Sequence, residues 1–214
     1  KTIGMSRFDA LRGDAIYPLV GREMEIELLL RRWHQASAGQ GAVVAIAGEA
    51  GIGKSRIVES MLARIDGKPQ ARFIYSCSPY HAHSALYPFI ARIEHDAGFK
   101  PGDSADTRLD KLKALLKPTA SDLPRDVALL AELVGIRTEP RHPSLTVSPQ
   151  QKREMLFGAL LGQIDGAASE GPILIVVEDA HWMDPTSADL LERLVHRAAS
   201  LPILVIVTLR PGFQ

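Results

Sequence analysis

The stretch GEAGIGKS, residues 48–55, combines residue types that bind phosphate groups. It matches the pattern G-x-x-x-x-G-K-[ST], with Gly48, Gly53, Lys54 and Ser55 at the fixed positions. Glycines let backbone N–H groups turn inward around a phosphate. The lysine places a charge on the β and γ phosphates, and the serine hydroxyl coordinates Mg²⁺. The alternative is an ordinary strand-to-helix turn, but the apolar run before it and the helical pattern after it favour phosphate binding.

The candidate phosphate-binding residues are consecutive in the chain. They are Gly48, Glu49, Ala50, Gly51, Ile52, Gly53, Lys54, Ser55 and Arg56. The helix that is predicted to begin here adds partial positive charge at its N-terminus.

Two carboxylates, Glu178 and Asp179, end a second apolar run with the sequence ILIVVED, residues 173–179. A phosphate-binding loop of this type needs an acidic residue at the end of a neighbouring buried strand to orient the Mg²⁺ shell. One carboxylate can hold metal-bound water, and the other can act as general base on the attacking water. The sequence leaves open which residue takes which role. A charged strand end in solvent is the alternative.

Other polar residues lie after apolar runs, where ligands bind in open α/β sheets. His181 and Asp184 could lie near the phosphates, although Asp184 is expected to cap the next helix. Arg210 could reach a γ-phosphate and report its presence, or it could be an exposed arginine before a turn. His81 and His83 form an H-x-H pair without a third ligand, which favours a polar loop over a metal site.

These residues must be positioned by strands and helices that alternate along the chain. Apolar runs at 42–47, 173–177 and 203–209, and a weaker one at 71–77, are typical of strands buried on both faces. Helical patterns cover four segments, at 23–37, 55–65, 149–164 and 185–199. This alternation predicts an α/β fold of the P-loop NTPase type, a three-layer sandwich with a mainly parallel sheet.

Residues 98–149 interrupt the alternation and hold six of the fourteen prolines. Two short leucine-rich helical patterns favour a helical insertion between the second and third strands over a flexible linker. Ser148, Pro149 and Gln151 form a capping-box pattern for the helix that follows. We expect residues 1–17 to be a linker from a preceding domain and residues 18–214 to form one P-loop ATPase domain.

The composition excludes several classes of protein. A formal net charge of zero gives no general attraction to nucleic acid or to anionic membranes. Cys77 is the only cysteine, which fits a reducing, cytoplasmic setting. The apolar runs are far shorter than the roughly 20 residues of a membrane span. The chain begins without Met and has no signal-peptide pattern, so we expect it to be a piece of a longer protein.

Five short stretches, in this order along the chain, resemble one family of regulatory ATPases. They are PLVGRE (18–23), GEAGIGKS (48–55), CSPY with ALYP (77–88), VEDAHWMDPTS (177–187) and VTLRP (207–211). They look like the signal-transduction ATPases with numerous domains, called STAND ATPases. More narrowly, they resemble the ATPase module that follows class III adenylate/guanylate cyclase domains in bacteria. The resemblance covers essentially the whole chain and is weakest over residues 98–149.

The resemblance implies an adenine nucleotide, ATP or ADP, with Mg²⁺. Val20, Gly21 and Arg22 would form the strip that contacts adenine, chiefly through backbone atoms. Residues 48–55 would bind the phosphates and Mg²⁺. The resemblance also implies an upstream cyclase-type domain, and downstream winged-helix and repeat domains, as partners in the parent chain.

The same resemblance assigns roles to the polar ends of the later strands. Glu178 and Asp179 would be the Walker B pair, and Arg210 would sense the γ-phosphate. The family often has Asp-Asp where this chain has Glu178-Asp179, and the extra methylene shifts the carboxylate. The predicted metal site is therefore Ser55, Glu178 and Asp179. The predicted catalytic residues are Lys54, Glu178, Asp179 and Arg210.

Related P-loop folds have the sheet order 5-1-4-3-2, and the runs found here supply strands 1 to 4. We expect the chain to stop before a fifth strand and before the winged-helix domain. Residues 42–47 would then form an open edge that favours pairing with another copy, including nucleotide-dependent self-association. Weak nucleotide binding and poor hydrolysis are the expected consequence for this chain.

The leading functional prediction is a regulatory ATPase module that binds Mg-ATP or Mg-ADP and hydrolyses ATP slowly to switch attached domains. A second prediction is a nucleotide-locked scaffold that mediates assembly without turnover. A third is an AAA+ ATPase that loads onto DNA, although zero net charge and the absence of a basic stretch argue against it. A GTPase is disfavoured because the chain has no N-K-x-D motif.

Overall fold

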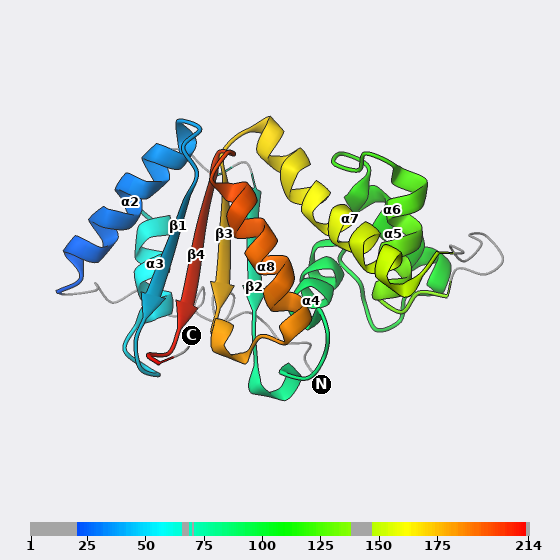
Figure 1. Cartoon of the computed structure of the whole chain (residues 1–214), viewed down its shortest axis with the longest axis horizontal. Coiled ribbons are helices and arrows are strands. Elements are labelled where there is room, and N and C mark those ends of the chain that lie inside the picture. The colour runs from blue at the N-terminus through cyan, green and yellow to red at the C-terminus, as the bar shows by residue number, and fades with distance from the viewer. Residues whose placement is uncertain (1–20, 66–68, 70, 138–146, 213–214) are drawn as a thin grey trace. The chain divides into compact units, whose positions relative to one another are not determined.

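The structure is a computed structural model that describes residues 21–65, 69, 71–137 and 147–212 (Figure 1). It divides into two compact units, one formed by residues 1–85 with 171–214 and the other by residues 86–170. The predicted linker at 1–17 lies outside the described residues. The boundaries 18–214 and 98–149 stay predictions.

The first unit is built on a four-stranded parallel sheet with the order β1-β4-β3-β2. The strands are β1 (Ala42–Ala47), β2 (Ala71–Ser76), β3 (Ile173–Glu178) and β4 (Ile203–Leu209). The two central strands, β3 and β4, are apolar on both faces and almost entirely buried. The predicted α/β fold and the predicted order of these four strands are confirmed.

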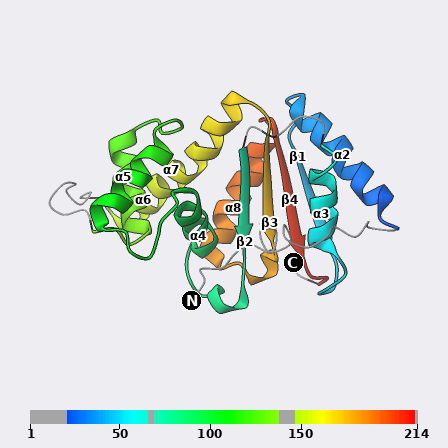
Figure 2. The same ribbon diagram turned by 180° about the vertical axis from the view of Figure 1, so that it is seen from behind.

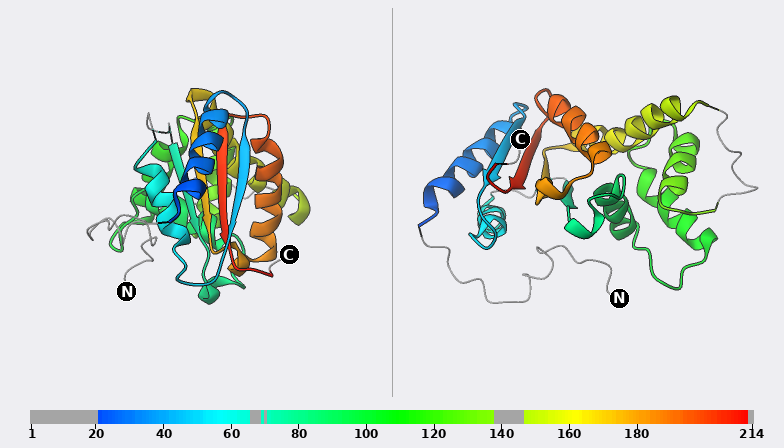
Figure 3. Two further views of the ribbon diagram at one scale, coloured as in Figure 1. Left: turned by 90° about the vertical axis from the view of Figure 1, so that its left-hand side faces the viewer. Right: turned by 60° about the horizontal axis from the view of Figure 1, so that its bottom comes forward.

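Helices cover both faces of this sheet. Figure 3 (left) shows the sheet edge-on, with α3 (Lys54–Leu62) on one side and α8 (Pro185–Ala198) on the other. The helix α2 (Glu23–Ser37) packs with α3 over the same face. This arrangement makes the three layers of the first unit.

The core between α2, α3 and the sheet follows from helical periodicity. Ile26, Leu29, Trp33 and Ala36 recur every three or four residues on α2, and all are buried. They share one apolar cluster with side chains of α3, β3 and β4: Ile57, Val58, Met61, Leu174, Val176, Leu204 and Ile206. On α8 the same spacing buries Leu190, Leu194 and Ala198.

Strand β1 lies at one edge of the described sheet, where it pairs with β4 alone. Its side chains alternate between half-buried and exposed, and Val43 is 43% exposed, so the prediction that residues 42–47 are buried on both faces is wrong for the described part of the chain. Because every strand is parallel, all four carboxyl ends reach the same edge of the sheet, which is where ligands bind in such folds.

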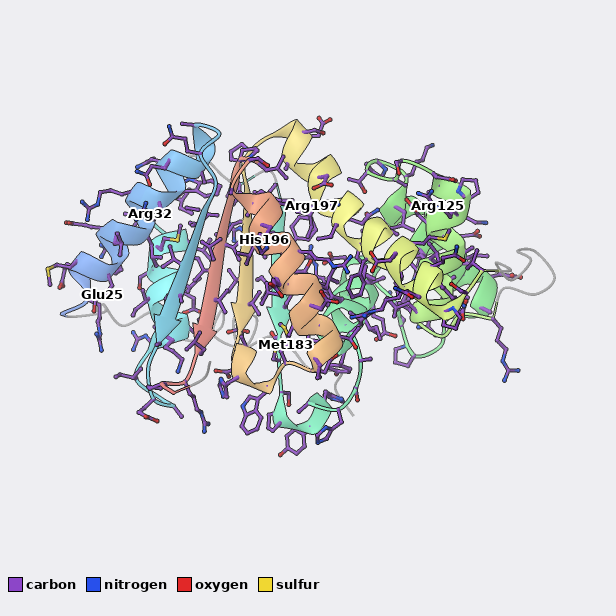
Figure 4. All side chains as sticks on the ribbon, in the orientation of Figure 1. Glu25, Arg32, Arg125, Met183, His196 and Arg197 are labelled. Atoms are coloured by element: carbon purple, nitrogen blue, oxygen red, sulfur yellow. The ribbon has the colours of Figure 1, made fainter. Side chains whose placement is uncertain are left out.

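The second unit consists of helices between β2 and β3, so the predicted helical insertion is confirmed (Figure 2). The helices are α4 (Tyr87–Asp96), α5 (Ala105–Leu116), α6 (Leu123–Leu133) and α7 (Pro149–Glu170). The Lys152 ammonium of α7 lies 2.5 Å from the Glu132 carboxylate of α6. Arg125 of α6 is labelled in Figure 4 and contacts the buried carboxylate of Asp126 at 3.3 Å.

Two details of this unit differ from the prediction. Helix α4 was not predicted; it begins directly after Leu86, whose backbone has a left-handed φ of 59°. Helix α7 ends at Glu170 rather than near residue 164, because it continues through Gly166 and stops only before Gly171. The capping box is confirmed: Ser148 N donates to Gln151 Oε1 at 3.0 Å, and Gln151 N donates to Ser148 Oγ at 3.2 Å.

Candidate functional site

The glycine-rich turn begins where β1 ends and closes at the first residue of α3. Gly48 N donates to Leu209 O of β4 at 3.2 Å, which ties the start of the turn to the sheet. Gly51 and Gly53 have φ values of +81° and +95°, in the left-handed region that favours glycine. Gly53 is the N-cap of α3, so the helix N-terminus lies directly at the turn.

Lys54 is the first residue of α3, and only 8% of it is exposed. Its ammonium donates to Gly48 O at 2.7 Å and to Glu49 O at 3.0 Å. The lysine charge is therefore held inside the turn, whose outer residues, from Glu49 to Ile52, are exposed. A buried ammonium at a helix N-terminus is suited to an anionic ligand.

Glu178, the last residue of β3, is 4% exposed and lies between two hydroxyl groups. Ser55 Oγ donates to Glu178 Oε1 at 3.3 Å, and Ser76 Oγ of β2 donates to Glu178 Oε2 at 2.9 Å. The predicted pair of Ser55 and Glu178 is thus brought together across 123 positions of sequence. Sequence reasoning missed Ser76; the signal available was a hydroxyl residue at the end of the neighbouring strand.

Asp179 follows with a left-handed backbone, φ 51° and ψ 46°. Its N–H donates to Thr208 Oγ1 of β4 at 2.9 Å. The two acidic residues of the pair therefore have different surroundings, because Glu178 belongs to the strand and Asp179 to the turn after it.

A pocket of about 320 Å³ is lined by residues of the glycine-rich turn and by residues at the carboxyl ends of three strands. Its lining includes Lys54, Glu178, Asp179, Arg210 and, after β2, the segment from Ser76 to Tyr80. The guanidinium carbon of the exposed Arg210 lies 5.8 Å from the centre of the Trp182 ring, and both residues line this pocket. Four predicted catalytic residues thus face one space.

His181 lies close enough to charged residues of this pocket for their charges to shift its pKa. Burial lowers the pKa of its imidazole; the Asp179 charge opposes this shift, and the Arg210 and Lys54 charges reinforce it. Neither ring nitrogen has a hydrogen-bond partner among the described residues. The ring centre lies 5.1 Å from that of Trp182, in the short helix η2 (Ala180–Trp182).

Asp184 caps α8, as predicted. Its carboxylate accepts from Thr186 N at 2.9 Å and from Ser187 N at 3.0 Å, and it is 3% exposed. Met183, labelled in Figure 4, precedes it and leads from η2 into this helix. Asp184 is occupied with the cap and does not line the pocket.

A second, more apolar pocket of about 250 Å³ lies between α2, β1 and α3. Arg22 and Glu25 (labelled in Figure 4) line it together with side chains of β1 and with Lys54. Arg22 Nη1 lies 2.7 Å from Glu25 Oε1. Gly21, with φ +79°, precedes Arg22, whereas Val20 lies outside the described residues. Lys54 therefore borders both pockets.

The sequence model of the AAA ATPase domain matches residues 18–206. The chain belongs to the AAA ATPase domain family. The match includes both pockets except for Arg210, and it includes the helical segment between β2 and β3.

Two further proteins are similar to this AAA ATPase domain. An uncharacterized protein of Rhizobium meliloti (strain 1021) is 32% identical over 211 residues, which is 99% of this chain and 20% of that protein. The chain thus spans about a fifth of the length of that relative. The structure of cbiO1 from Clostridium perfringens, part of the ABC transporter complex cbiONQ, is 17% identical, with a TM-score of 0.35. The similarity covers 80% of this chain and 68% of that one.

An AAA ATPase domain uses a nucleotide and Mg²⁺, and the residues of this site fit both. Ser55 Oγ and Glu178 Oε1 lie 3.3 Å apart. Both are oxygen atoms, the ligand type that Mg²⁺ prefers. No group of three or more His, Cys, Asp or Glu side chains suited to a metal ion occurs in the described ranges. Mg²⁺ usually keeps several waters and needs only one or two carboxylates beside the phosphates.

No helix in the described part of the chain is long and apolar enough to cross a membrane.

Proposed function

We propose that this chain is a regulatory ATPase module that binds Mg-ATP or Mg-ADP and hydrolyses ATP slowly to switch attached domains. The observation that carries the proposal is the hydrogen bond of Ser55 with Glu178, a residue that lines one pocket together with Lys54 and Asp179. A turn that only joined a strand to a helix would not need a buried lysine and a buried glutamate at its mouth.

The hydrogen bonds support a separate role for each group of residues in the site. The N–H groups of residues 48–55 and the Lys54 ammonium bind the phosphates. Ser55, Glu178 and Asp179 are the residues that would hold Mg²⁺. When bound, Mg²⁺ neutralises phosphate charge and helps to align the terminal phosphate.

Asp179 is the proposed general base on the attacking water. Asp179 and Glu178 both line the pocket with Lys54 and Arg210, and Glu178 is assigned to the metal because it accepts a hydrogen bond from Ser55 of the turn. Arg210, at the mouth of the pocket, is placed to contact a γ-phosphate and to respond when that group is lost.

We place the adenine against Gly21 and Arg22, with Val20 completing the strip. Support comes from the apolar pocket that Arg22 lines and that shares Lys54 with the phosphate pocket. Apolar walls with a few polar groups suit a planar base.

The finer family assignment is also a proposal: a STAND-type module that follows a cyclase-type domain and precedes winged-helix and repeat domains, in the cytoplasm. The five sequence stretches and the length of the Rhizobium meliloti relative support a larger parent protein. Loading onto DNA is disfavoured because the formal net charge is zero.

Two substitutions test the reaction. Asp179→Asn should lower single-turnover ATP hydrolysis by about 100-fold or more while leaving Mg-ADP affinity within about threefold. Glu178→Gln should raise the Mg²⁺ concentration needed for nucleotide binding, because it weakens the metal side of the site. A wild-type chain that binds nucleotide but shows no hydrolysis would contradict the ATPase proposal and support the scaffold.

A further inference from the structure

The two central strands separate just before the acidic pair. The pairing of β3 with β4 ends at Val177 and Val207. Each strand continues with its other neighbour: Glu178 pairs with Ser76, and Leu209 pairs with Ala47. The pairing of β3 with β4 therefore ends one residue before the carboxylates begin.

Asp179 follows the last pair of β3 and β4 by two residues and has an unusual backbone. It is one of two non-glycine residues with positive φ in the described ranges, the other being Leu86. A short polar side chain makes aspartate one of the residues most tolerant of this left-handed region, whereas longer side chains occupy it less readily. The backbone thus favours Asp at 179, and the extended strand accepts Glu at 178.

The Asp179 N–H loses its partner in the sheet where the strands separate, and a side chain replaces that partner. Thr208 Oγ1 accepts the Asp179 N–H at 2.9 Å. Thr208 is 2% exposed, so water cannot easily take over this role. A buried hydroxyl on β4 therefore holds the turn that follows β3.

We propose that Thr208 is a positioning residue for the reaction. By holding the Asp179 N–H, it fixes the left-handed turn and with it the direction in which the Asp179 carboxylate enters the pocket. Thr208 does not line that pocket, so it acts through Asp179 and not on the nucleotide. The inference rests on the proposed function, in which Asp179 is the general base.

The test compares Thr208→Val with Thr208→Ser in the whole chain. Valine has nearly the same shape but leaves the Asp179 N–H without its acceptor, whereas serine keeps the hydroxyl. Thermal unfolding checks that each variant folds, and Thr208→Ala replaces Thr208→Val if valine prevents folding. Two readouts are made on each variant: the hydrogen-exchange rate of the Asp179 amide by NMR, and single-turnover ATP hydrolysis alongside Mg-ADP affinity.

In Thr208→Val, the Asp179 amide should exchange at least about tenfold faster. Hydrolysis should fall by about 10- to 100-fold with Mg-ADP affinity unchanged, because misplacing a reacting group by about 1 Å costs rate and not binding. Thr208→Ser should restore most of both properties. A residue with a merely structural role would lower stability and binding together and would not separate the two readouts.

The inference is overturned if the wild type hydrolyses ATP and Thr208→Val hydrolyses it equally well, or if the Asp179 amide exchanges at the same rate in both. A wild type without hydrolysis, with faster amide exchange in Thr208→Val, would instead sink the proposed function: the hydrogen bond would be real but would serve no reaction.

Discussion

At the scale of single residues, the glutamate at position 178 is accommodated by its neighbours. One carboxylate oxygen accepts from Ser55 Oγ and the other accepts from Ser76 Oγ. These two hydrogen bonds hold the carboxylate of a side chain that is one methylene longer than aspartate. The departure from the Asp-Asp pattern therefore leaves a carboxylate beside the serine of the turn.

Cys77, next to this glutamate, gives a prediction about alkaline stability. Burial raises the pKa of its thiol to about 12, and the charges of Asp179, Asp184 and Glu178 act in the same direction. Between about pH 9 and 12 the unfolded chain releases the thiol proton while the folded chain retains it, so the unfolding free energy falls as pH rises. Without nucleotide or Mg²⁺, it should fall more steeply than in Cys77→Ala, by at most about 1.4 kcal/mol per pH unit.

Urea denaturation of both proteins at several pH values from 8 to 10.5 measures this difference. Parallel curves for the wild type and Cys77→Ala would show that the thiol titrates normally in the folded protein.

At the scale of elements, two glycines of α7 allow the effect of side-chain packing on stability to be measured apart from the effect of helix propensity. A Cβ at Gly166 would lie 2.7 Å from Thr119 Cβ and 2.9 Å from Thr119 Cα, so α7 packs closely against the turn after α5. One turn earlier, a Cβ at Gly162 would meet nothing within 4 Å. The two positions share a helix and differ in what faces them.

We therefore expect opposite effects from the same substitution. Gly162→Ala should stabilise the protein by about 0.5–1 kcal/mol through helix propensity. Gly166→Ala should destabilise it by about 1–3 kcal/mol, because backbone as well as side chain of Thr119 must move. Thermal unfolding of both variants beside the wild type measures the pair, and equal shifts would contradict the close contact.

The elements themselves were largely predictable from local patterns. The strands 42–47 and 203–209 and the helix 23–37 have the predicted bounds, because apolar runs of strand length and a wide apolar helix face are strong local signals. Helix α4 was missed although Pro88 lies in its first turn, because its N-cap is a left-handed leucine, Leu86, and not one of the usual capping residues. Ser76 and the bond from Asp179 to Thr208 depend on strand order, which residue types alone do not reveal.

At the scale of the whole molecule, the chain combines a sheet unit that holds the entire described site with a helical unit inserted into it. The site residues that the sequence indicated were those with short fixed spacing, in the turn at 48–55 and the pair at 178–179. Which carboxylate faces the serine could not be read from spacing, because it depends on where β3 and β4 separate. The chain covers 20% of the length of the Rhizobium meliloti relative.

The most direct test of the account is calorimetric titration of Mg-ADP and Mg-ATP into the wild type, Lys54→Ala and Lys117→Ala. Lys54 is buried in the turn, whereas Lys117 is an exposed lysine of the helical unit and serves as the matched control. We predict one nucleotide per chain for the wild type and Lys117→Ala, and affinity at least about tenfold lower for Lys54→Ala. Equal nucleotide affinity in all three proteins would contradict the assignment of this turn as the phosphate site.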